Sequence, residues 1–332
     1  MFRSIIYVFS GTKNTLLAAG MVKDALEYRN VHTEIFEVTK PFINVPNPND
    51  YDYVGFAYPV HAFNVPQVFL EFVRQLPDAH RKAFIFKTSG EPLHANDSSS
   101  YRLYRILQRK GFDIFQNRHF LMPYNIMFRY RDSLAKQMHQ TTEALSRLFA
   151  KQIATGARKK LRFPLRHRLL SIVLRIQQPA ARFNGHFYSV NSSKCSQCML
   201  CEQTCPTRNI SFKDGKFKFD GSCVMCMRCV MFCPEDALTP GLLHFFKVNG
   251  AYEYERLLAD SSVPSNYINE NTTGYFRLFK KYFRNAAHEL AEDAQLKTDD
   301  TDELLVHLES LDRALASHHD DEDEPLMRKR AN

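Results

Sequence analysis

Apolar positions follow two alternating patterns through the first half of the chain. Five short runs are rich in β-branched and aromatic residues, which is typical of strands. These runs cover residues 4–9, 32–38, 53–58, 83–87 and 113–121. The other segments repeat apolar residues at helical spacing and cover residues 14–29, 65–76, 99–109 and 132–153. Strands that alternate with helices predict an α/β domain with a doubly wound, parallel sheet of five strands.

The second half of the chain changes its pattern several times. Pro164 opens a basic segment in which residues 165–177 are predicted to form an amphipathic helix. Aromatic residues at helical spacing over 275–283 are more typical of a core face than of a face that binds a partner. We therefore expect an α/β domain, a basic connector helix, a cysteine-rich module, a helical region and an acidic, partly disordered tail. Their expected boundaries are 1–155, 156–185, 186–241, 242–288 and 289–332.

Length and composition are those of an ordinary globular protein. The 332 residues suffice for two domains with separate cores, and 44% of them are apolar while 24% are charged. No apolar run approaches the roughly 20 residues that span a bilayer, and no secretory leader is recognisable at the start. We expect a soluble protein of the cytoplasm without a transmembrane segment.

All eight cysteines lie between Cys195 and Cys233. Such clustering is typical of metal binding and not of disulfides spread through a secreted fold, which again favours the cytoplasm. The pattern Cys-x2-Cys-x2-Cys-x3-Cys-Pro occurs twice, beginning at Cys195 and at Cys223. It is the bacterial type of iron-sulfur run, in which the fourth cysteine binds the cluster of the other run.

We therefore assign four cysteines to each of two 4Fe-4S clusters. One set is Cys195, Cys198, Cys201 and Cys233, and the other is Cys223, Cys226, Cys229 and Cys205. Paired Cys-x2-Cys motifs also bind zinc, so two zinc knuckles are the alternative. Between the runs, residues 210–219 alternate around Asp214-Gly215, which predicts a hairpin. The module resembles the small α+β fold of two-cluster bacterial ferredoxins.

A loop rich in hydroxyl groups follows the first predicted strand. It reads Ser10-Gly-Thr-Lys-Asn-Thr15 and leads into a helix, where hydroxyls and backbone N–H groups suit a phosphate dianion. The loop resembles the FMN phosphate loop of flavodoxins, whose flavin lies at the switch point between strands one and three. The resemblance implies that the loops after the third and fourth strands hold the isoalloxazine ring. The implied FMN-binding residues are Ser10, Thr12, Lys13, Asn14, Thr15, Tyr58, Pro59, Val60, His61, Ala62, Phe63, Asn64, Thr88, Ser89, Gly90 and Glu91.

The loop departs from the flavodoxin pattern at Lys13, where the family commonly has glycine. The Lys13 side chain could crowd the phosphate, or its ammonium group could pair with it. Because the chain has no tryptophan, stacking on the flavin would fall to Tyr58, His61 or Phe63. A flavodoxin-like domain that has lost its cofactor is the alternative.

The whole pattern resembles the family of flavodoxin-ferredoxin fusion proteins of anaerobic and fermentative bacteria. The resemblance includes Thr88-Ser-Gly-Glu-Pro92 and Met122-Pro-Tyr-Asn125, although the residues themselves give no role for the second motif. It implies FMN and two 4Fe-4S clusters as cofactors. No Gly-x-Gly-x-x-Gly fingerprint occurs, so direct oxidation of NAD(P)H is not expected.

Three functional hypotheses follow from this architecture. An electron-transfer protein would pass electrons between the clusters and FMN, and would link one-electron with two-electron carriers among its redox partner proteins. A flavoenzyme would instead reduce a small organic acceptor, with His61 and Glu91 as proton donors. The third hypothesis is a non-redox adaptor that keeps the fold.

Charge is distributed unevenly along the chain. Residues 144–201 contain no Asp or Glu but eleven Lys and Arg, more than the net charge of +8 for the whole chain. This basic segment is either a solvated linker, neutralised by the module or by the acidic tail, or a docking surface. A docking surface would suit an acidic redox protein or an anionic membrane. Nucleic-acid binding is not expected, because no base-reading motif accompanies the charge.

Overall fold

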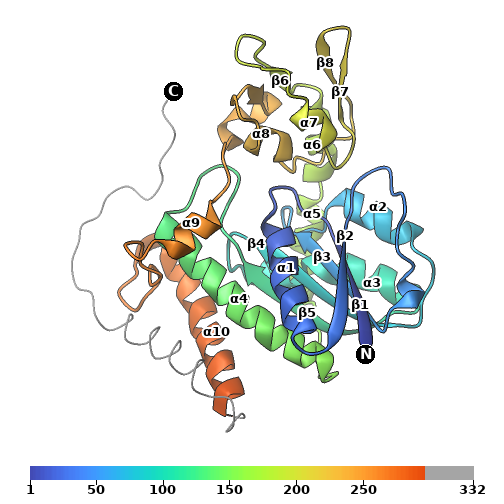
Figure 1. Cartoon of the computed structure of the whole chain (residues 1–332), viewed down its shortest axis with the longest axis vertical. Coiled ribbons are helices and arrows are strands. Elements are labelled where there is room, and N and C mark those ends of the chain that lie inside the picture. Colours follow the sequence, from blue (N-terminus) through green and yellow to red (C-terminus); the bar gives the residue numbers. More distant parts are fainter. Residues whose placement is uncertain (296–332) are drawn as a thin grey trace.

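A five-stranded parallel sheet forms the centre of the N-terminal domain in the computed structural model, which describes residues 1–295. Its strands are β1 (Phe2–Val8), β2 (Val31–Glu37), β3 (Tyr53–Pro59), β4 (Lys82–Ser89) and β5 (Asp113–Leu121). They pair in the order β2-β1-β3-β4-β5 (Figure 1). This is the order of flavodoxin-like sheets, with the switch point between β1 and β3. The predicted fold and its five strands are confirmed.

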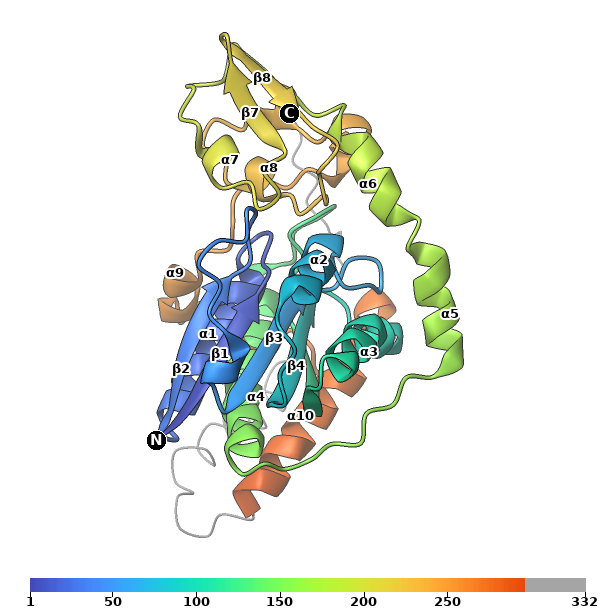
Figure 2. The same cartoon turned by 90° about the vertical axis from the view of Figure 1, so that its right-hand side faces the viewer.

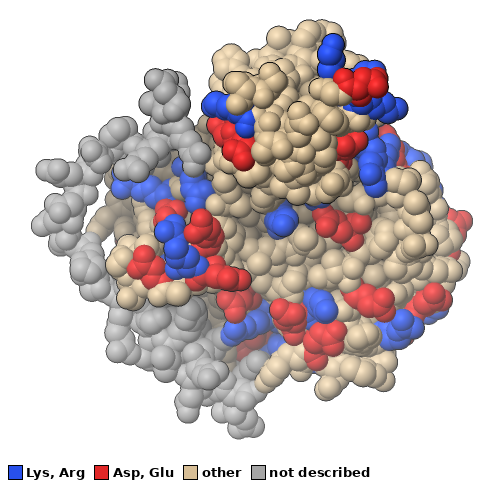
Figure 3. All heavy atoms as spheres, turned by 45° about the horizontal axis from the view of Figure 1, so that its top comes forward, with Lys and Arg blue, Asp and Glu red and all other residues tan. Residues whose placement is uncertain are grey.

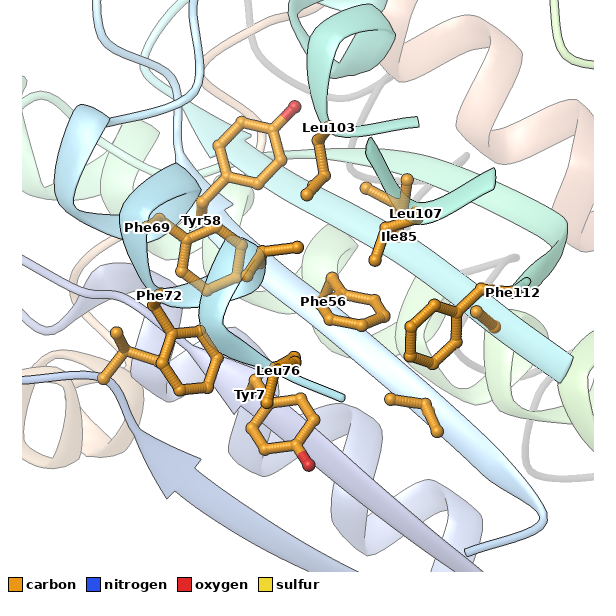
Figure 4. Packing of buried hydrophobic residues seen from close by; sticks show 14 of the residues in the cluster. Tyr7, Phe56, Tyr58, Phe69, Phe72, Leu76, Ile85, Leu103, Leu107 and Phe112 are labelled. Atoms are coloured by element: carbon orange, nitrogen blue, oxygen red, sulfur yellow. The ribbon is translucent and has the colours of Figure 1, made fainter. Parts of the chain in front are cut away.

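Helices cover both faces of the sheet. One face carries α1 (Asn14–Glu27) and α4 (Asp132–Ala154), and the other carries α2 (Gln67–Gln75) and α3 (Tyr101–Arg109). Two short 3-10 helices, η1 (Pro48–Asp50) and η2 (His94–Ser100), precede β3 and α3. Because strand side chains alternate, Phe84 and Phe86 enter the core under α1 and α4, whereas Ile85 enters the core under α2 and α3. Figure 4 shows this second core, in which rings from β1, β3 and α2 pack against one another.

The connector runs along the outside of the α/β domain as two helices (Figure 2). They are α5 (Leu165–Leu174) and α6 (Gln177–Gly185), so the helix predicted over 165–177 ends earlier and a second one follows it. Pro179 explains the break, because its ring conflicts with the carbonyl group of Arg175 in a continuous helix. Within residues 1–295, no helix combines the length and the apolar character needed to cross a membrane.

The cysteine-rich module consists of two halves with one backbone pattern. Its strands form two antiparallel pairs, β6 (Ser189–Val190) with β9 (Leu238–Thr239) and β7 (Ile210–Lys213) with β8 (Lys216–Phe219). Each half has one short helix, α7 (Leu200–Gln203) or α8 (Arg228–Met231). Equivalent residues lie 28 positions apart, and pairs such as Met199 and Met227 share left-handed backbone angles. The hairpin predicted at Asp214-Gly215 is confirmed, with positive φ at both residues.

The C-terminal region returns from the module to the α/β domain. After η3 (Gly241–Phe246), the chain forms α9 (Tyr254–Ala259), η4 (Gly274–Phe276) and α10 (Arg277–Gln295). The aromatic stripe predicted as a core face is confirmed at Phe276 and Phe279, which are buried, whereas Tyr275 is exposed.

Helix α10 lies beside α4 (Figures 1 and 2). It continues past the expected start of the acidic tail at residue 289, because Leu290 and Ala294 are buried. An ion pair of 2.9 Å between Arg118 and Glu289 joins it to β5. The rest of the expected tail, residues 296–332, lies outside the described residues.

Candidate functional site

Two cavities inside the cysteine-rich module are each lined by four cysteines. Cys195, Cys198, Cys201 and Cys233 line the first cavity, whereas Cys205, Cys223, Cys226 and Cys229 line the second. The fourth cysteine of each run therefore reaches the cavity of the other run, and all eight thiols are free of disulfides. The structure thus brings together the members of each set assigned from the sequence.

The thiols surround these cavities instead of converging on one point. Within residues 1–295, no group of three or more His, Cys, Asp or Glu side chains is arranged to hold a single metal ion. Zinc needs four ligands at about 2.0–2.3 Å from one centre, whereas a cubane cluster offers separate irons to separate thiolates. Each cavity is lined by four thiols, the number that a cubane cluster takes.

Backbone N–H groups point at sulfur atoms in the same way in both halves. The pairs, with their N to Sγ distances, are Gln197 to Cys195 (3.4 Å), Met225 to Cys223 (3.4 Å), Asn209 to Cys205 (3.3 Å) and Ala237 to Cys233 (3.3 Å). Such donors stabilise thiolate charge and help to set the reduction potential of a cluster. Because the donors are equivalent, other features must distinguish the two cavities.

Solvent exposure is one such feature. Cys198 at the first cavity is exposed, whereas the four cysteines at the second are all partly buried. Burial raises the pKa of the Cys226 thiol to about 12 and that of Cys201 to about 11. These thiols are protonated at neutral pH, so a cluster bound by them would displace their protons.

The loop of residues 10–15 connects β1 to α1 at the switch point of the sheet. Lys13 is the N-cap of α1 and makes no side-chain capping hydrogen bond, so an anion can accept from the N–H groups of Asn14 and Thr15 in the first turn. The backbone of Lys13 is left-handed, with a φ of 69°, the region that glycine adopts readily. Its ammonium nitrogen lies 5.2 Å from the centroid of the Phe232 ring, in the cysteine-rich module.

Hydroxyl groups of this loop are positioned by other protein groups. Ser10 Oγ accepts from the Leu16 N–H at 3.3 Å, and Thr12 Oγ1 accepts from Asn125 Nδ2 at 2.7 Å. A hydroxyl that accepts a hydrogen bond keeps its own hydrogen to donate, so both groups suit a phosphate. Asn14 Nδ2 donates to the Pro123 carbonyl at 2.9 Å. The segment 122–125 therefore closes over the loop, a role that the sequence did not reveal.

The loop after β4 lies beside the same segment. Thr88 Oγ1 is 2.7 Å from Thr15 Oγ1, which ties the first and fourth strand ends together. A Cβ atom on Gly90 would lie 2.5 Å from Tyr124 Cδ2, so only glycine permits this contact. Three of the segments that carry the sequence resemblance thus meet at the carboxyl ends of the strands.

Tyr58 belongs to the core instead of the loop surface. Its ring is fully buried and packs against Phe69 at 6.0 Å (Figure 4), and its hydroxyl lies 2.9 Å from Ser99 Oγ. Of the three residues considered for stacking on a flavin, His61 and Phe63 remain at the strand end.

His61 and Phe63 lie in a tight turn after β3. Backbone hydrogen bonds of 2.9 Å link His61 with Asn64 in both directions, and Ala62 and Phe63 have positive φ. Asn64 is buried and contacts the connector, because its Oδ1 accepts from Ser171 Oγ at 2.8 Å. Burial lowers the pKa of His61 to about 4.

Arg228 joins the second cysteine run to the loop of residues 10–15. Its Nε donates to the Gly11 carbonyl at 2.9 Å, and one terminal nitrogen contacts both the Ser10 carbonyl and the Glu37 carboxylate. Its other terminal nitrogen donates to the Thr204 carbonyl at 3.1 Å, within its own module. The side chain is buried, so these partners replace water around a cation.

Gly11 brings the two backbones into contact. A Cβ atom at this position would lie 2.5 Å from the Cys226 carbonyl oxygen and 2.9 Å from Cys226 Cβ. Val224 and Cys226 also pack against the core under α2 and α3. The second cavity therefore adjoins the loop of residues 10–15. The visible outer face of the module is largely uncharged (Figure 3).

Comparisons with known proteins support the iron-sulfur character of the cysteine-rich module. A family model described as a 4Fe-4S binding domain matches residues 188–211 and 218–239. Among solved structures, a flavodoxin of Streptococcus pneumoniae TIGR4 is 14% identical, with a TM-score of 0.34, and the match covers 47% of this chain and 99% of that one. Oxidised flavodoxin 2 of Bacillus cereus is 13% identical, with a TM-score of 0.35 and coverages of 46% and 99%. The flavodiiron protein of Giardia intestinalis is 15% identical, with a TM-score of 0.33 and coverages of 46% and 36%. No curated protein matches the chain significantly.

Proposed function

Since this chain is a fusion of a flavodoxin-like domain with a 4Fe-4S ferredoxin-type domain, we propose that it is an electron-transfer protein in which two 4Fe-4S clusters exchange electrons with FMN. One observation carries the proposal: the backbone of the second cysteine run touches the candidate phosphate loop at Gly11. Cofactors held at these two places would be neighbours, as an electron-transfer protein requires.

The eight cysteines would hold the clusters in the two sets that line the cavities. Cys226 belongs to the set beside the phosphate loop, and the exposed Cys198 belongs to the other set. We infer that an external one-electron partner meets the module near Cys198. The set at the second cavity would then be the one that serves the flavin.

Residues 10–15 would hold the FMN phosphate. Ser10 and Thr12 offer hydroxyl hydrogens, and the first turn of α1 offers N–H groups. The Arg228 guanidinium, paired with Glu37, holds the Ser10 and Gly11 carbonyl groups on the other side of the loop. FMN can carry one or two electrons, whereas each cluster carries one, so the bound cofactors would link the two kinds of carrier.

The side chains considered as proton donors do not favour a flavoenzyme. His61 is neutral at pH 7, because burial lowers its pKa to about 4, and an effective acid has a pKa near the working pH. The Glu91 carboxylate accepts a hydrogen bond from the Tyr275 hydroxyl. Electron transfer needs neither group, and we therefore prefer it.

The test is anaerobic purification of the full chain, followed by assays of iron, acid-labile sulfide and released FMN. We expect about eight irons and one FMN per chain. After mixing with reduced methyl viologen, loss of flavin absorbance should follow loss of cluster absorbance. Iron without flavin would contradict FMN binding, and half the expected iron would contradict the second cluster.

A further inference from the structure

The apolar residues of α5 face away from the protein. The connector stripe consists of Leu165, Leu169, Ile172 and Val173 of α5 and of Ile176 just beyond its end, and each of these residues is between 54% and 72% exposed. At 100° per residue their positions fall within one third of the helix circumference. Figure 2 shows α5 on the outer side of the molecule. Large exposed aliphatic stripes are uncommon on globular proteins unless another surface covers them.

The opposite side of α5 is attached to the α/β domain. Ser171 is buried and exchanges hydrogen bonds with Asn64, by its carbonyl at 2.9 Å and by its hydroxyl at 2.8 Å. The Arg168 guanidinium stacks on the Tyr101 ring at 3.9 Å. These contacts hold the helix so that the connector stripe faces solvent.

Arginines flank the connector stripe on both sides. By helical position, Arg166 lies on one side of it, and Arg168 and Arg175 lie on the other. Burial and the nearby guanidinium groups of Arg175 and Arg74 lower the pKa of Arg102 on α3, so cations from neighbouring helices gather beside α5. No Asp or Glu occurs between residues 144 and 201 to neutralise them locally.

We propose that the connector stripe binds the surface of an anionic lipid bilayer. The aliphatic side chains would enter the boundary between headgroups and acyl chains, and the exposed Arg166 beside them would pair with a lipid phosphate. A symmetric contact between two copies of α5 is disfavoured, because it would place the same arginines opposite one another. The membrane would then lie along the α5 side of the molecule, and the α/β domain would stay in water.

The test is co-sedimentation of the full, cofactor-loaded protein with extruded vesicles. We compare pure phosphatidylcholine with an equimolar mixture of phosphatidylcholine and phosphatidylglycerol. The wild type should bind the anionic vesicles and be released by salt. Leu169→Ser combined with Val173→Ser should weaken this binding about tenfold or more, and Arg166→Gln should weaken it about fivefold.

The matched control removes exposed apolar side chains elsewhere. Tyr28 and Ile43 are 82% and 61% exposed and lie outside the connector. Tyr28→Ser combined with Ile43→Ser should leave vesicle binding unchanged. The proposal is overturned if the wild type does not bind anionic vesicles, or if the connector and control variants bind equally well. A dimer in light scattering that only the connector variant abolishes would also overturn it, in favour of a second copy as the occupant.

Discussion

Nε of Arg228 lies 2.9 Å from the carbonyl oxygen of Gly11, although the two residues are 217 positions apart. One side chain inside an iron-sulfur run thus donates to the loop that is the candidate phosphate site. Its pseudo-symmetric counterpart, Leu200, stands on the outer surface. The module therefore has a docked half and an outward half, although the two runs have the same cysteine spacing.

Replacement of Arg228 should separate the domains without unfolding either one. Arg228→Leu introduces the side chain of the equivalent Leu200 and removes the partner of Glu37, with a loss of about 3 kcal/mol of interface stability. Iron content should stay the same, whereas flavin reduction by the clusters should become slower in stopped-flow experiments. Arg208→Ala is the control, because Arg208 also crosses the interface but is exposed. Equal rates in wild type and Arg228→Leu would show that the contact is unimportant.

A methyl group at position 11 should have a similar effect for a steric reason. Gly11→Ala would place Cβ 2.5 Å from the Cys226 carbonyl oxygen, so the backbones must move apart. Gly20→Ala is matched to it, since no atom lies within 4 Å of the added Cβ. That control should stabilise α1 by about 0.5–1 kcal/mol. Limited proteolysis of the links between the domains should be faster only in Gly11→Ala.

The exchange of the fourth cysteine can be tested by pairs of variants. Cys205→Ser and Cys226→Ser should remove the same electron paramagnetic resonance signal, because both thiols line the second cavity. Cys233→Ser and Cys198→Ser should remove the other signal. Each variant should lose about four irons. If Cys205→Ser gave the same spectrum as Cys198→Ser, each run would hold its own fourth ligand.

Lys13 should destabilise the domain through its backbone. A residue with a Cβ atom loses about 1–2 kcal/mol of stability in the left-handed region, and glycine avoids this cost. Glycine, however, loses more backbone entropy on folding, which offsets part of that advantage. Lys13→Gly should therefore be about 0.5–1 kcal/mol more stable than Lys13→Ala. Both variants lose the contact with Phe232, so their difference in denaturant unfolding isolates the backbone. No difference would argue against the left-handed geometry at this position.

Acid should destabilise the α/β domain through His119. Burial, followed by the charge of Lys87, lowers the pKa of His119 to about 4, below an unfolded value of about 6.5. The unfolded chain therefore takes up a proton first, and stability that is present above pH 6.5 falls as the pH drops toward 4. His119→Gln should reduce this slope by at most about 1.4 kcal/mol per pH unit. Unfolding curves of the wild type and of His119→Gln from pH 7.5 to 5 measure this change, and equal slopes would contradict it.

Local signals in the sequence predicted most of the fold. Strand and helix periodicity located the five strands, and cysteine spacing grouped the thiols that line each cavity. Tyr58 was predicted to lie beside the flavin, but the structure places it in the core. The alternation of side chains along β3 predicts this, because Tyr58 lies two and four residues after Phe56 and Val54, which enter the same core.

Contacts between the domains could not be predicted in this way. They depend on how two separately folded units meet, and no short pattern encodes that placement. Arg228 offered one clue, because a cation occupies a position that is apolar in the first run. Asn125 offered none, since an isolated Asn in a loop is compatible with many partners.

The return of the chain to α10 beside α4 makes the cysteine-rich module an insertion in the α/β domain. A unit that is held by both of its ends remains near its docking site even when the contact opens. Its effective concentration at that site is set by the two links and not by the amount of protein in the cell. The Arg228 contact can therefore be modest in strength, and exchange between the domains should be first order at any dilution.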